Sequence, residues 1–319
     1  MIINSISSIK HTSTLNNTYY NKKYTPYKNQ IITDSFTKNI SFYGNILHNN
    51  YDEWFKTYLK YSNEKAAIAN DISKIILQPA FLNIPEKQIK ILDIGCGNGE
   101  LTQQIINNLL EKFPHKQINL DAFDINDNLL TELKKRLEIL KHKNLYTHSE
   151  HLDYFKSKTN DTKYDFLLAS HVLYYTDNID NALQKIFQQL KTNGKGIIVH
   201  HSGENCLLSK LRAKYNPQSI ANLNQSMEEI QKNDIIQNSL EKQNIPYKKQ
   251  KQYFQLNIPS NIKSNDFKNL IRFLIDTPYD ILLKENKINK LLTDIQNYID
   301  FQNRIHLFNN MYIINGRNI

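Results

Sequence analysis

The sequence feature that most constrains the fold is an apolar run that ends in three closely spaced glycines. Residues Ile91–Glu100 read ILDIGCGNGE. Glycine lets a chain turn tightly and lets a ligand approach the backbone without meeting a Cβ atom. A helix that begins directly after such a turn offers unpaired N–H groups at its first turn. This stretch therefore predicts a buried strand, a ligand-binding turn and a helix.

Strand-like and helix-like patterns alternate along the middle of the chain. The strands expected from short apolar runs are 90–94, 118–124, 145–149, 164–170 and 196–200, and the helices expected between them are 101–112, 128–141 and 179–190. Strands that are apolar on both faces and alternate with helices are typical of a parallel sheet covered by helices. In such a sheet, ligands bind beyond the carboxyl ends of the strands.

Further elements are expected on both sides of this core. Two helices are predicted between Tyr51 and Ile76, with a break near Ser62, and two late strands, 249–258 and 306–314, fit a hairpin at the sheet edge. The C-terminal helices predicted from apolar spacing are 206–215, 220–230, 234–243, 267–282 and 287–298. The predicted fold class is α/β, a Rossmann-like seven-stranded, mostly parallel sheet with helices on both faces and a helical cap.

The first 48 residues differ in composition from the rest of the chain. They are rich in Ser, Thr, Asn, Tyr and Lys, with Asp34 as the only acid, and we expect residues 1–48 to form a flexible extension. Such an extension is either a plain tail or a targeting or secretion signal. Residues 49–319 are expected to form one domain, with a cofactor core at about 80–203 and substrate-binding elements from 49–79 and 204–319.

Charge and cysteine content exclude several classes of protein. Lys and Arg number 40 against 31 Asp and Glu, which gives a net charge of +9, but the basic residues are spread out, so we expect no nucleic-acid partner. The chain has no apolar run long enough to span a membrane. Cys96 and Cys206 cannot form a disulfide framework, which favours a reducing, cytoplasmic location. His200 and His201 adjoin no third ligand at suitable spacing, so no metal site is expected.

The glycine spacing separates two cofactor classes. Dinucleotide-binding turns favour Gly-x-Gly-x-x-Gly, whereas here the third glycine comes one residue early. The pattern Gly95-x-Gly97-x-Gly99, led by Asp93, resembles motif I of class I S-adenosylmethionine-dependent methyltransferases. The resemblance implies that Asp93 or its neighbours face the methionine amino group and that the glycine turn lies against the adenosyl moiety of S-adenosyl-L-methionine.

Other strand ends supply candidate cofactor contacts. Asp124 ends the second predicted strand, where a carboxylate accepts hydrogen bonds from both ribose hydroxyls. Leu152 and Asp153 follow the third strand, where this fold places its adenine contacts. Ser170 ends the fourth strand and is expected to reach the crevice between cofactor and substrate. A solvated turn or a surface loop is the structural alternative for the acids.

Four segments together resemble one family, the histamine N-methyltransferases. The residues that carry the resemblance over about 50–315 are Tyr51–Asp71 with Ser62-Asn63-Glu64-Lys65, the glycine motif with Glu100, Asp165-Phe166 through Leu173-Tyr174-Tyr175-Thr176-Asp177, and Leu307-Phe308-Asn309-Asn310. The resemblance implies that Glu64 binds the substrate ammonium and that Asn310 holds an imidazole ring. His171 stands where the family has a glutamine, and Tyr174 or Tyr175 would supply an aromatic wall.

These residues also have purely structural interpretations. Glu64 near a helix start favours the helix dipole, and His171 and Asn310 could be satisfied polar groups of the core. In the functional interpretation, Glu64 anchors the substrate while His171 and Asn310 orient the acceptor nitrogen toward the methyl group. Orientation does most of the catalysis, because the methyl group of a sulfonium is already activated. His171 could alternatively accept the released proton.

Several alternative functions stay open at the sequence level. The methyl acceptor could be another small molecule, such as a carboxylate or a phenol, or a protein. Nucleic-acid amino methylation is disfavoured, because Ser170-His171-Val172-Leu173 replaces the Asn/Asp-Pro-Pro-Tyr/Phe pattern of those enzymes. A protein that binds the cofactor without catalysis and a nicotinamide oxidoreductase are the less favoured alternatives. The sequence does not give the oligomeric state, for which a monomer is the working expectation.

Overall fold

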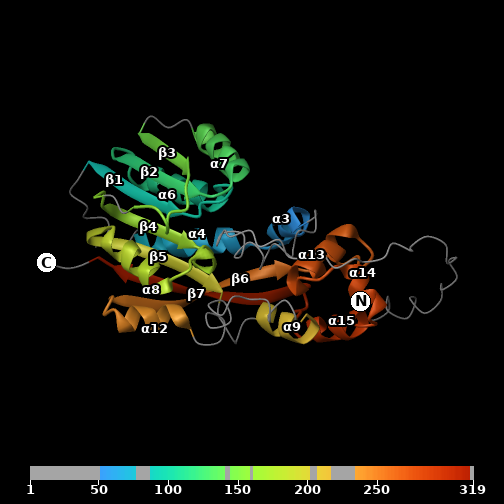
Figure 1. Ribbon diagram of the computed structural model, residues 1–319. Coiled ribbons are helices and arrows are strands. Elements are labelled where there is room, and N and C mark those ends of the chain that lie inside the picture. The colour runs from blue at the N-terminus through green and yellow to red at the C-terminus, as the bar shows by residue number, and fades with distance from the viewer. Residues whose placement is uncertain are drawn as a thin grey trace, which may run out of the picture.

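The computed structural model describes residues 51–76, 87–140, 144–158, 161–201, 207–216 and 234–316 (Figure 1). The predicted extension 1–48 and the predicted helix 220–230 lie outside these residues. Among the helices in these ranges, none has the length and apolar character needed to cross a membrane.

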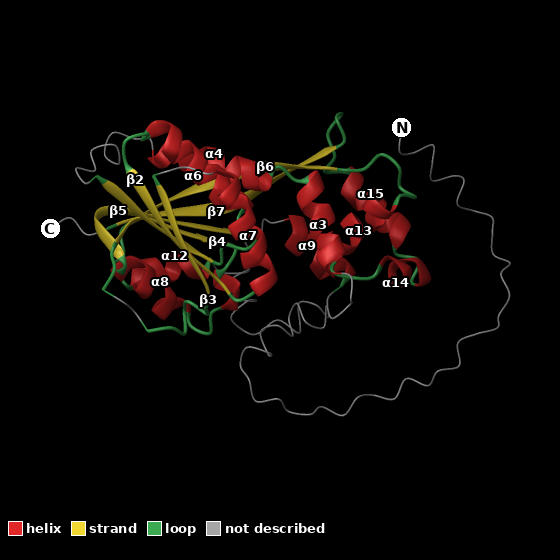
Figure 2. Ribbon diagram, turned by 90° about the horizontal axis from the view of Figure 1, so that it is seen from above, coloured by secondary structure: helices red, strands yellow, loops and turns green. Residues whose placement is uncertain are grey.

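A seven-stranded sheet with helices around it forms one part of the molecule, on the left in Figure 2. Its strands lie in the order β3-β2-β1-β4-β5-β7-β6. Their bounds are β1 Gln88–Ile94, β2 Gln117–Asp124, β3 Leu145–His151, β4 Tyr164–Ser170, β5 Leu190–His201, β6 Tyr247–Asn257 and β7 Arg304–Asn315. Strands β1 to β5 pair in parallel, and β7 is antiparallel to both β5 and β6. The predicted mostly parallel sheet is confirmed. Its two late strands pair antiparallel at the edge as expected, but they do not form a hairpin, because residues 258–303 separate them in the chain.

Helices cover both faces of this sheet. On one face lie α4 (Glu64–Ile76), α6 (Glu100–Lys112) and α7 (Asp127–Leu140), whose leucines and isoleucines share a buried core with β1, β2 and β4. On the other face lie α8 (Ile179–Gln188) and α12 (Ile235–Lys242), which pack on the alternate residues of the same strands. This arrangement follows from strands that are apolar on both faces.

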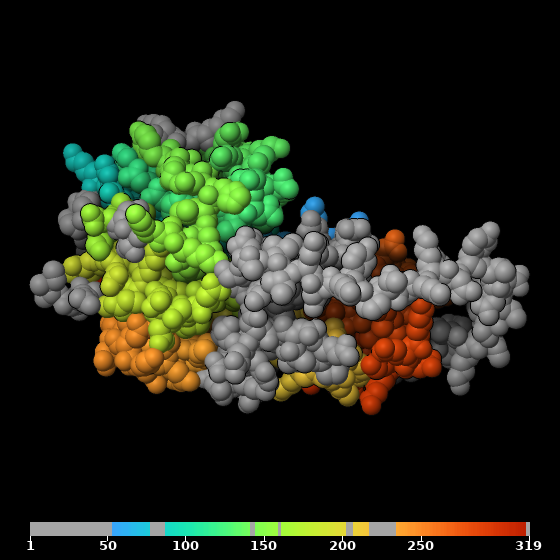
Figure 3. Space-filling model, viewed as in Figure 1, coloured from blue at the N-terminus to red at the C-terminus, as the bar shows by residue number. Residues whose placement is uncertain are grey.

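A second group of helices packs at one end of the sheet, and we call it the helical lobe. It consists of α3 (Tyr51–Tyr61), α9 (Leu207–Tyr215), α13 (Asn265–Ile275), α14 (Tyr279–Lys284) and α15 (Ile288–Gln296) (Figure 1). The antiparallel pair β6–β7 runs from the sheet into this lobe, and α13, α14 and α15 connect its two strands. Phe254, Leu256, Ile305 and Leu307 of this pair join the lobe's buried core. In Figure 3 the orange-red surface of the lobe's C-terminal helices lies at the opposite end from the green surface around α7.

Two predicted boundaries are wrong. The helix predicted over 267–282 is split, because the chain turns through the left-handed conformation at Asp276 (φ 58°) and continues into Pro278, which cannot extend a helix. Strand β5 starts at Leu190, six residues before the predicted start. The pairing of β4 with β5 is irregular at this point. Tyr164 pairs with Leu190, but Phe166, only two residues further along β4, pairs with Lys195, so the register of β5 shifts between them.

Candidate functional site

The glycine turn follows β1 as predicted, and its three glycines all take left-handed conformations. Their φ angles are 69° at Gly95, 54° at Gly97 and 75° at Gly99, a region that side chains with a Cβ rarely adopt. A Cβ atom on Gly95 would lie 2.6 Å from Cγ2 of Val172, whereas a Cβ atom on Gly97 would meet nothing within 4 Å. Gly95 therefore permits close packing inside the protein, and Gly97 leaves open space.

Two carboxylates hold this turn in place. Asp93, on β1, is buried and accepts a 2.5 Å hydrogen bond from the hydroxyl of Thr102. Burial raises the pKa of Asp93 to about 7, against the opposing effect of the Thr102 hydrogen bond. Asp124, at the end of β2, accepts the Gly97 N–H at 2.8 Å and the Asn126 N–H at 2.9 Å. Burial also raises the pKa of Asp124.

The remaining predicted cofactor residues lie at neighbouring strand ends. Leu152 follows β3 and donates its N–H to the carbonyl oxygen of Asp124 at 3.0 Å. Asp153 is half-buried and lies 3.4 Å from the Lys156 ammonium. Ser170 ends β4 and pairs with Val199 of β5. The fold thus places the predicted cofactor residues around one edge of the sheet, and their contacts with a cofactor stay predictions.

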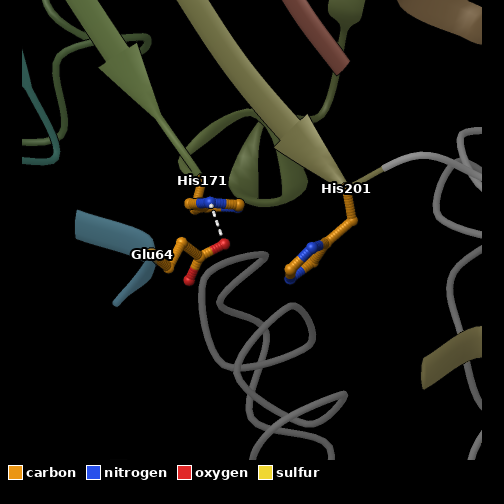
Figure 4. Close-up of side chains that lie close together, drawn as sticks. All are labelled: Glu64, His171 and His201. Atoms are coloured by element: carbon orange, nitrogen blue, oxygen red, sulfur yellow. Dashed lines mark ion pairs between the residues drawn. The ribbon is translucent and has the colours of Figure 1, made fainter. Parts of the chain in front are cut away.

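A second polar cluster surrounds Glu64, the first residue of α4. Glu64 is buried, with 6% of its surface exposed. Its Oε2 accepts the Tyr58 hydroxyl at 2.9 Å, and its Oε1 accepts Nδ2 of Asn309 at 2.7 Å. Nε2 of His171 lies 3.2 Å from the same Oε1 atom (Figure 4). The break between α3 and α4 fixes this position, because Asn63 is hydrogen-bonded to Gln255 of β6 through its backbone and its side chain.

Two histidines face Glu64 from the ends of neighbouring strands. His171 follows β4 and has an unusual left-handed φ of 54°. His201 ends β5, and the centroids of the two imidazole rings are 4.6 Å apart. Figure 4 shows the two rings and the Glu64 carboxylate converging from three different elements. Tyr174 is part of the same cluster, because its hydroxyl accepts the backbone N–H of His201 at 2.9 Å and lies 3.4 Å from Nδ1 of the His171 ring.

The electrostatics of this cluster favour an ionised carboxylate beside a neutral imidazole. Burial acts to raise the pKa of Glu64, but the charge of His171, whose Nε2 atom lies 3.2 Å away, outweighs it and lowers the pKa to about 2. Burial lowers the pKa of His201 to about 4. It also lowers the pKa of the neighbouring His200 well below its ordinary value. At neutral pH, Glu64 is therefore charged and His201 is neutral.

Adjacent asparagines on β7 have different surroundings. Asn309 contacts Glu64 and also pairs with Nδ1 of His201 at 3.0 Å. Asn310, the predicted substrate residue, pairs across the sheet with His200 and lies near the Tyr312 hydroxyl. Side chains alternate between the faces of a strand, so Asn310 points away from Glu64 and its substrate role stays a prediction. The sequence interpretation missed Asn309 and His201, which only the pairing of β5 with β7 brings to Glu64.

The two clusters are joined by contacts on both sides. Lys65, next to Glu64, donates to Oδ1 of Asn98 at 3.0 Å and to Oε2 of Glu100 at 3.1 Å, both at the glycine turn. Val172, next to His171, packs against Gly95. A ligand in the turn therefore adjoins the Glu64 cluster, and the ionised, buried carboxylate there suits a cationic group.

Comparison with known proteins gives a family match over much of the chain. Residues 85–255, more than half of the chain, match a family described as methyltransferase domain. Histamine N-methyltransferase of Bos taurus is 29% identical over 181 residues, which cover 53% of this chain and 60% of that protein. Malonyl-[acyl-carrier protein] O-methyltransferase of Bacillus cereus is 24% identical over 138 residues, or 43% of this chain and 46% of that protein.

The overall fold is also similar to a solved structure. The YcgJ protein of Bacillus subtilis aligns with a TM-score of 0.50 and 14% identity, over 79% of this chain and 98% of that one. This similarity concerns the fold alone. The chain spans about 60% of the length of the bovine histamine N-methyltransferase and 56% of the Cavia porcellus protein.

Proposed function

The chain belongs to the methyltransferase domain family, and from this premise we propose that it transfers a methyl group from S-adenosyl-L-methionine to a nitrogen of a small amine or imidazole. The observation that carries the proposal is the buried Glu64 carboxylate, which is held ionised beside His171 and adjoins the glycine turn. A buried anion of this kind favours a cationic ligand.

The residues around the glycine turn fit the proposed methyl donor. Gly97 leaves space for a nucleoside to approach the backbone. Asp124 lies one strand away, where its carboxylate is suited to ribose hydroxyls, and Asp93 is suited to the methionine ammonium. Leu152 and Asp153 would hold the adenine, and Ser170 would lie near the reacting end. When bound, this donor supplies a methyl group that a sulfonium has already activated.

For the acceptor, we propose that Glu64 binds a cationic end while His171 and Tyr174 orient the nitrogen that is methylated. Asn310 has no part in this arrangement, because it lies on the opposite face of β7 from Asn309 and Glu64. A neutral nitrogen has a lone pair available, so positioning and the exclusion of water supply most of the rate enhancement. The nitrogen forms a bond to the methyl carbon, the carbon–sulfur bond breaks, and its electron pair stays on sulfur. In its neutral form, His171 then accepts the proton that the methylated nitrogen releases.

The test is a methyl-transfer assay with labelled S-adenosyl-L-methionine, histamine and a panel of related amines and imidazoles. Glu64→Gln should raise the KM for the amine about tenfold or more, because losing a hydrogen bond to a charged group costs about 1.5–3 kcal/mol. Glu53→Gln, a change at an exposed acid on α3, serves as the matched control and should leave KM unchanged. An unchanged KM in Glu64→Gln would show that Glu64 does not bind the cationic end of the substrate.

A second candidate is methylation of a carboxylate, which the similarity to the malonyl-[acyl-carrier protein] O-methyltransferase favours. The buried, ionised Glu64 argues against it, since a carboxylate substrate would be repelled. The same assay with small carboxylic acids separates the two candidates. Calorimetric titration with S-adenosyl-L-methionine addresses a third possibility, in which the chain binds the cofactor without turnover.

A further inference from the structure

The Glu64 cluster contains three donors of two kinds, carboxylate oxygen and imidazole nitrogen, that transition-metal ions bind in proteins. Each of Glu64, His171 and His201 offers one ligand atom, and these atoms all lie within 4.8 Å of one another. Donors bound to one tetrahedral ion are about 3.3 Å apart for metal–ligand bonds of about 2.0–2.1 Å. The 3.2 Å between Nε2 of His171 and Oε1 of Glu64 already meets this requirement.

His171 has an unsatisfied nitrogen at the centre of this cluster. Its Nε2 atom is buried and, among the residues that the structure describes, has no hydrogen-bond partner of acceptable geometry, although Glu64 is close. A buried polar atom without a partner is rare in native proteins. The left-handed backbone at His171 directs this atom at Glu64, and such strained residues cluster at functional sites.

The outer contacts of the three residues match those of a built metal site. Metal-binding histidines usually use their second nitrogen for a hydrogen bond that fixes the ring. Nδ1 of His201 pairs with Oδ1 of Asn309 at 3.0 Å, and Nδ1 of His171 lies 3.4 Å from the Tyr174 hydroxyl. The second carboxylate oxygen of Glu64 accepts the Tyr58 hydroxyl. With both Nδ1 atoms in contact with other side chains, the Nε2 atoms of the two histidines are the nitrogens left for an ion.

We propose that Glu64, His171 and His201 bind a divalent transition-metal ion of the zinc or iron(II) type. Two imidazoles and one carboxylate are a known ligand set for zinc with an open fourth position and for non-haem iron(II). Hard ions such as magnesium prefer oxygen ligands and should not bind. The proposal departs from the expectation drawn from sequence spacing, because Glu64 and His171 reach His201 only through the fold.

The ion and a cationic substrate would require the same carboxylate. Zinc should therefore inhibit amine methylation competitively with the amine, a consequence that rests on the proposed function. Metal binding itself does not depend on the methyl acceptor. Direct binding measurements thus test the site even if the proposed methyl transfer is wrong, and a failed metal site leaves the methyl-transfer assay unaffected.

The first measurement uses the full-length chain after treatment with a chelator. Titration with zinc chloride should give one tight site per chain, cobalt(II) should give visible absorption typical of histidine ligation, and magnesium should give no binding. Zinc should also protect His171 and His201 from modification by diethyl pyrocarbonate, while the exposed His148 and His306 stay reactive. This protection is measured on the unmodified sequence, so it does not depend on whether a variant folds.

Variants then locate the site. His201→Gln and Glu64→Gln should each weaken zinc binding at least tenfold. His200→Gln is the matched control, because His200 is buried at the same strand end but is paired with Asn310 rather than Asn309; it should change the zinc affinity less than twofold. Undiminished binding in His201→Gln, or equal reactivity of His171 with and without zinc, would overturn the proposal.

Discussion

At the scale of single residues, the glycine turn is held by packing as well as by backbone conformation. Gly95 combines a φ of 69° with contact to Val172, so its surroundings exclude a side chain for two separate reasons. Gly97 has the same kind of backbone but open space around it. Gly95 therefore allows the turn to pack closely against Val172, and Gly97 is the better candidate for contact with a ligand.

This difference predicts the effect of a methyl group at Gly95. Gly95→Ala should lower the free energy of unfolding by about 1–3 kcal/mol, since overpacking adds to the strain at positive φ. Val172→Ala in the same chain should recover part of the loss by removing the clash, while the strain remains. Urea unfolding of the two single variants and the double variant measures the coupling. Strictly additive losses would contradict the packing argument.

Asp93 should make stability depend on pH. Its pKa in the folded chain is about 7, above the ordinary value of 3.8, so the native state keeps a proton that the unfolded state loses. The contribution of Asp93 to stability is therefore fully present below about pH 4, falls as the pH rises toward 7, and is constant above that value.

Asp93→Asn should remove this dependence, because an amide is neutral but can still accept the Thr102 hydrogen bond. Relative to the native sequence, the variant should gain stability between pH 5 and pH 8, by about 1.4 kcal/mol at most for each pH unit up to about pH 7. Urea unfolding without added cofactor at the two pH values provides the measurement. The prediction would be wrong if the difference in stability between the variant and the native chain were the same at pH 5 and at pH 8.

At the scale of elements, β7 presents two adjacent asparagines to opposite faces. Asn309→Ala removes the hydrogen bonds to Glu64 and to Gln252, at 2.7 Å and 3.1 Å. It should destabilise the chain by about 1–3 kcal/mol, because buried acceptors lose their partner. Asn310→Ala leaves both bonds intact and should cost less. Thermal unfolding of the two variants measures the difference. Equal losses of stability would show that the face of β7 on which each asparagine lies does not determine its contribution to stability.

Most elements could be predicted because apolar periodicity reports which face of an element is buried. The start of β5 could not, since Lys191, Thr192, Asn193 and Gly194 have the composition of a turn. In the site, the sequence indicated Glu64 and His171 through resemblance. It did not show that Asn309 contacts Glu64, which lies 245 positions away in the chain and meets it through strand pairing. Local patterns carry no information about such distant contacts.

At the scale of the whole molecule, the antiparallel pair β6–β7 joins the sheet to the helical lobe. Its pairing is unbroken from Tyr247 with Ile314 to Asn257 with Arg304. One end carries Met311 and Ile313 in the core beneath α4 and α6, and the other carries Leu256 and Ile305 in the lobe. Because the same two strands contribute to both cores, the lobe should not unfold separately from the sheet.

The single tryptophan makes this testable. Trp54 is buried in the lobe and is the only tryptophan in the chain, so its fluorescence reports on the lobe, while circular dichroism reports on the whole fold. S-adenosylhomocysteine, the product of the proposed reaction, should bind at the glycine turn. At 100 times its Kd it adds about 2.7 kcal/mol of stability, which corresponds to a rise in Tm of about 4–5 °C for a chain of this size.

If the sheet and the lobe unfold together, Trp54 fluorescence and circular dichroism should show the same midpoint and the same upward shift with the ligand. The ligand would then stabilise a residue of α3 that lies in a different hydrophobic core from the turn. A fluorescence midpoint that stays fixed while the dichroism midpoint rises would instead show two independently folding units. In that case the β6–β7 pair would connect the sheet and the helical lobe without coupling their stability.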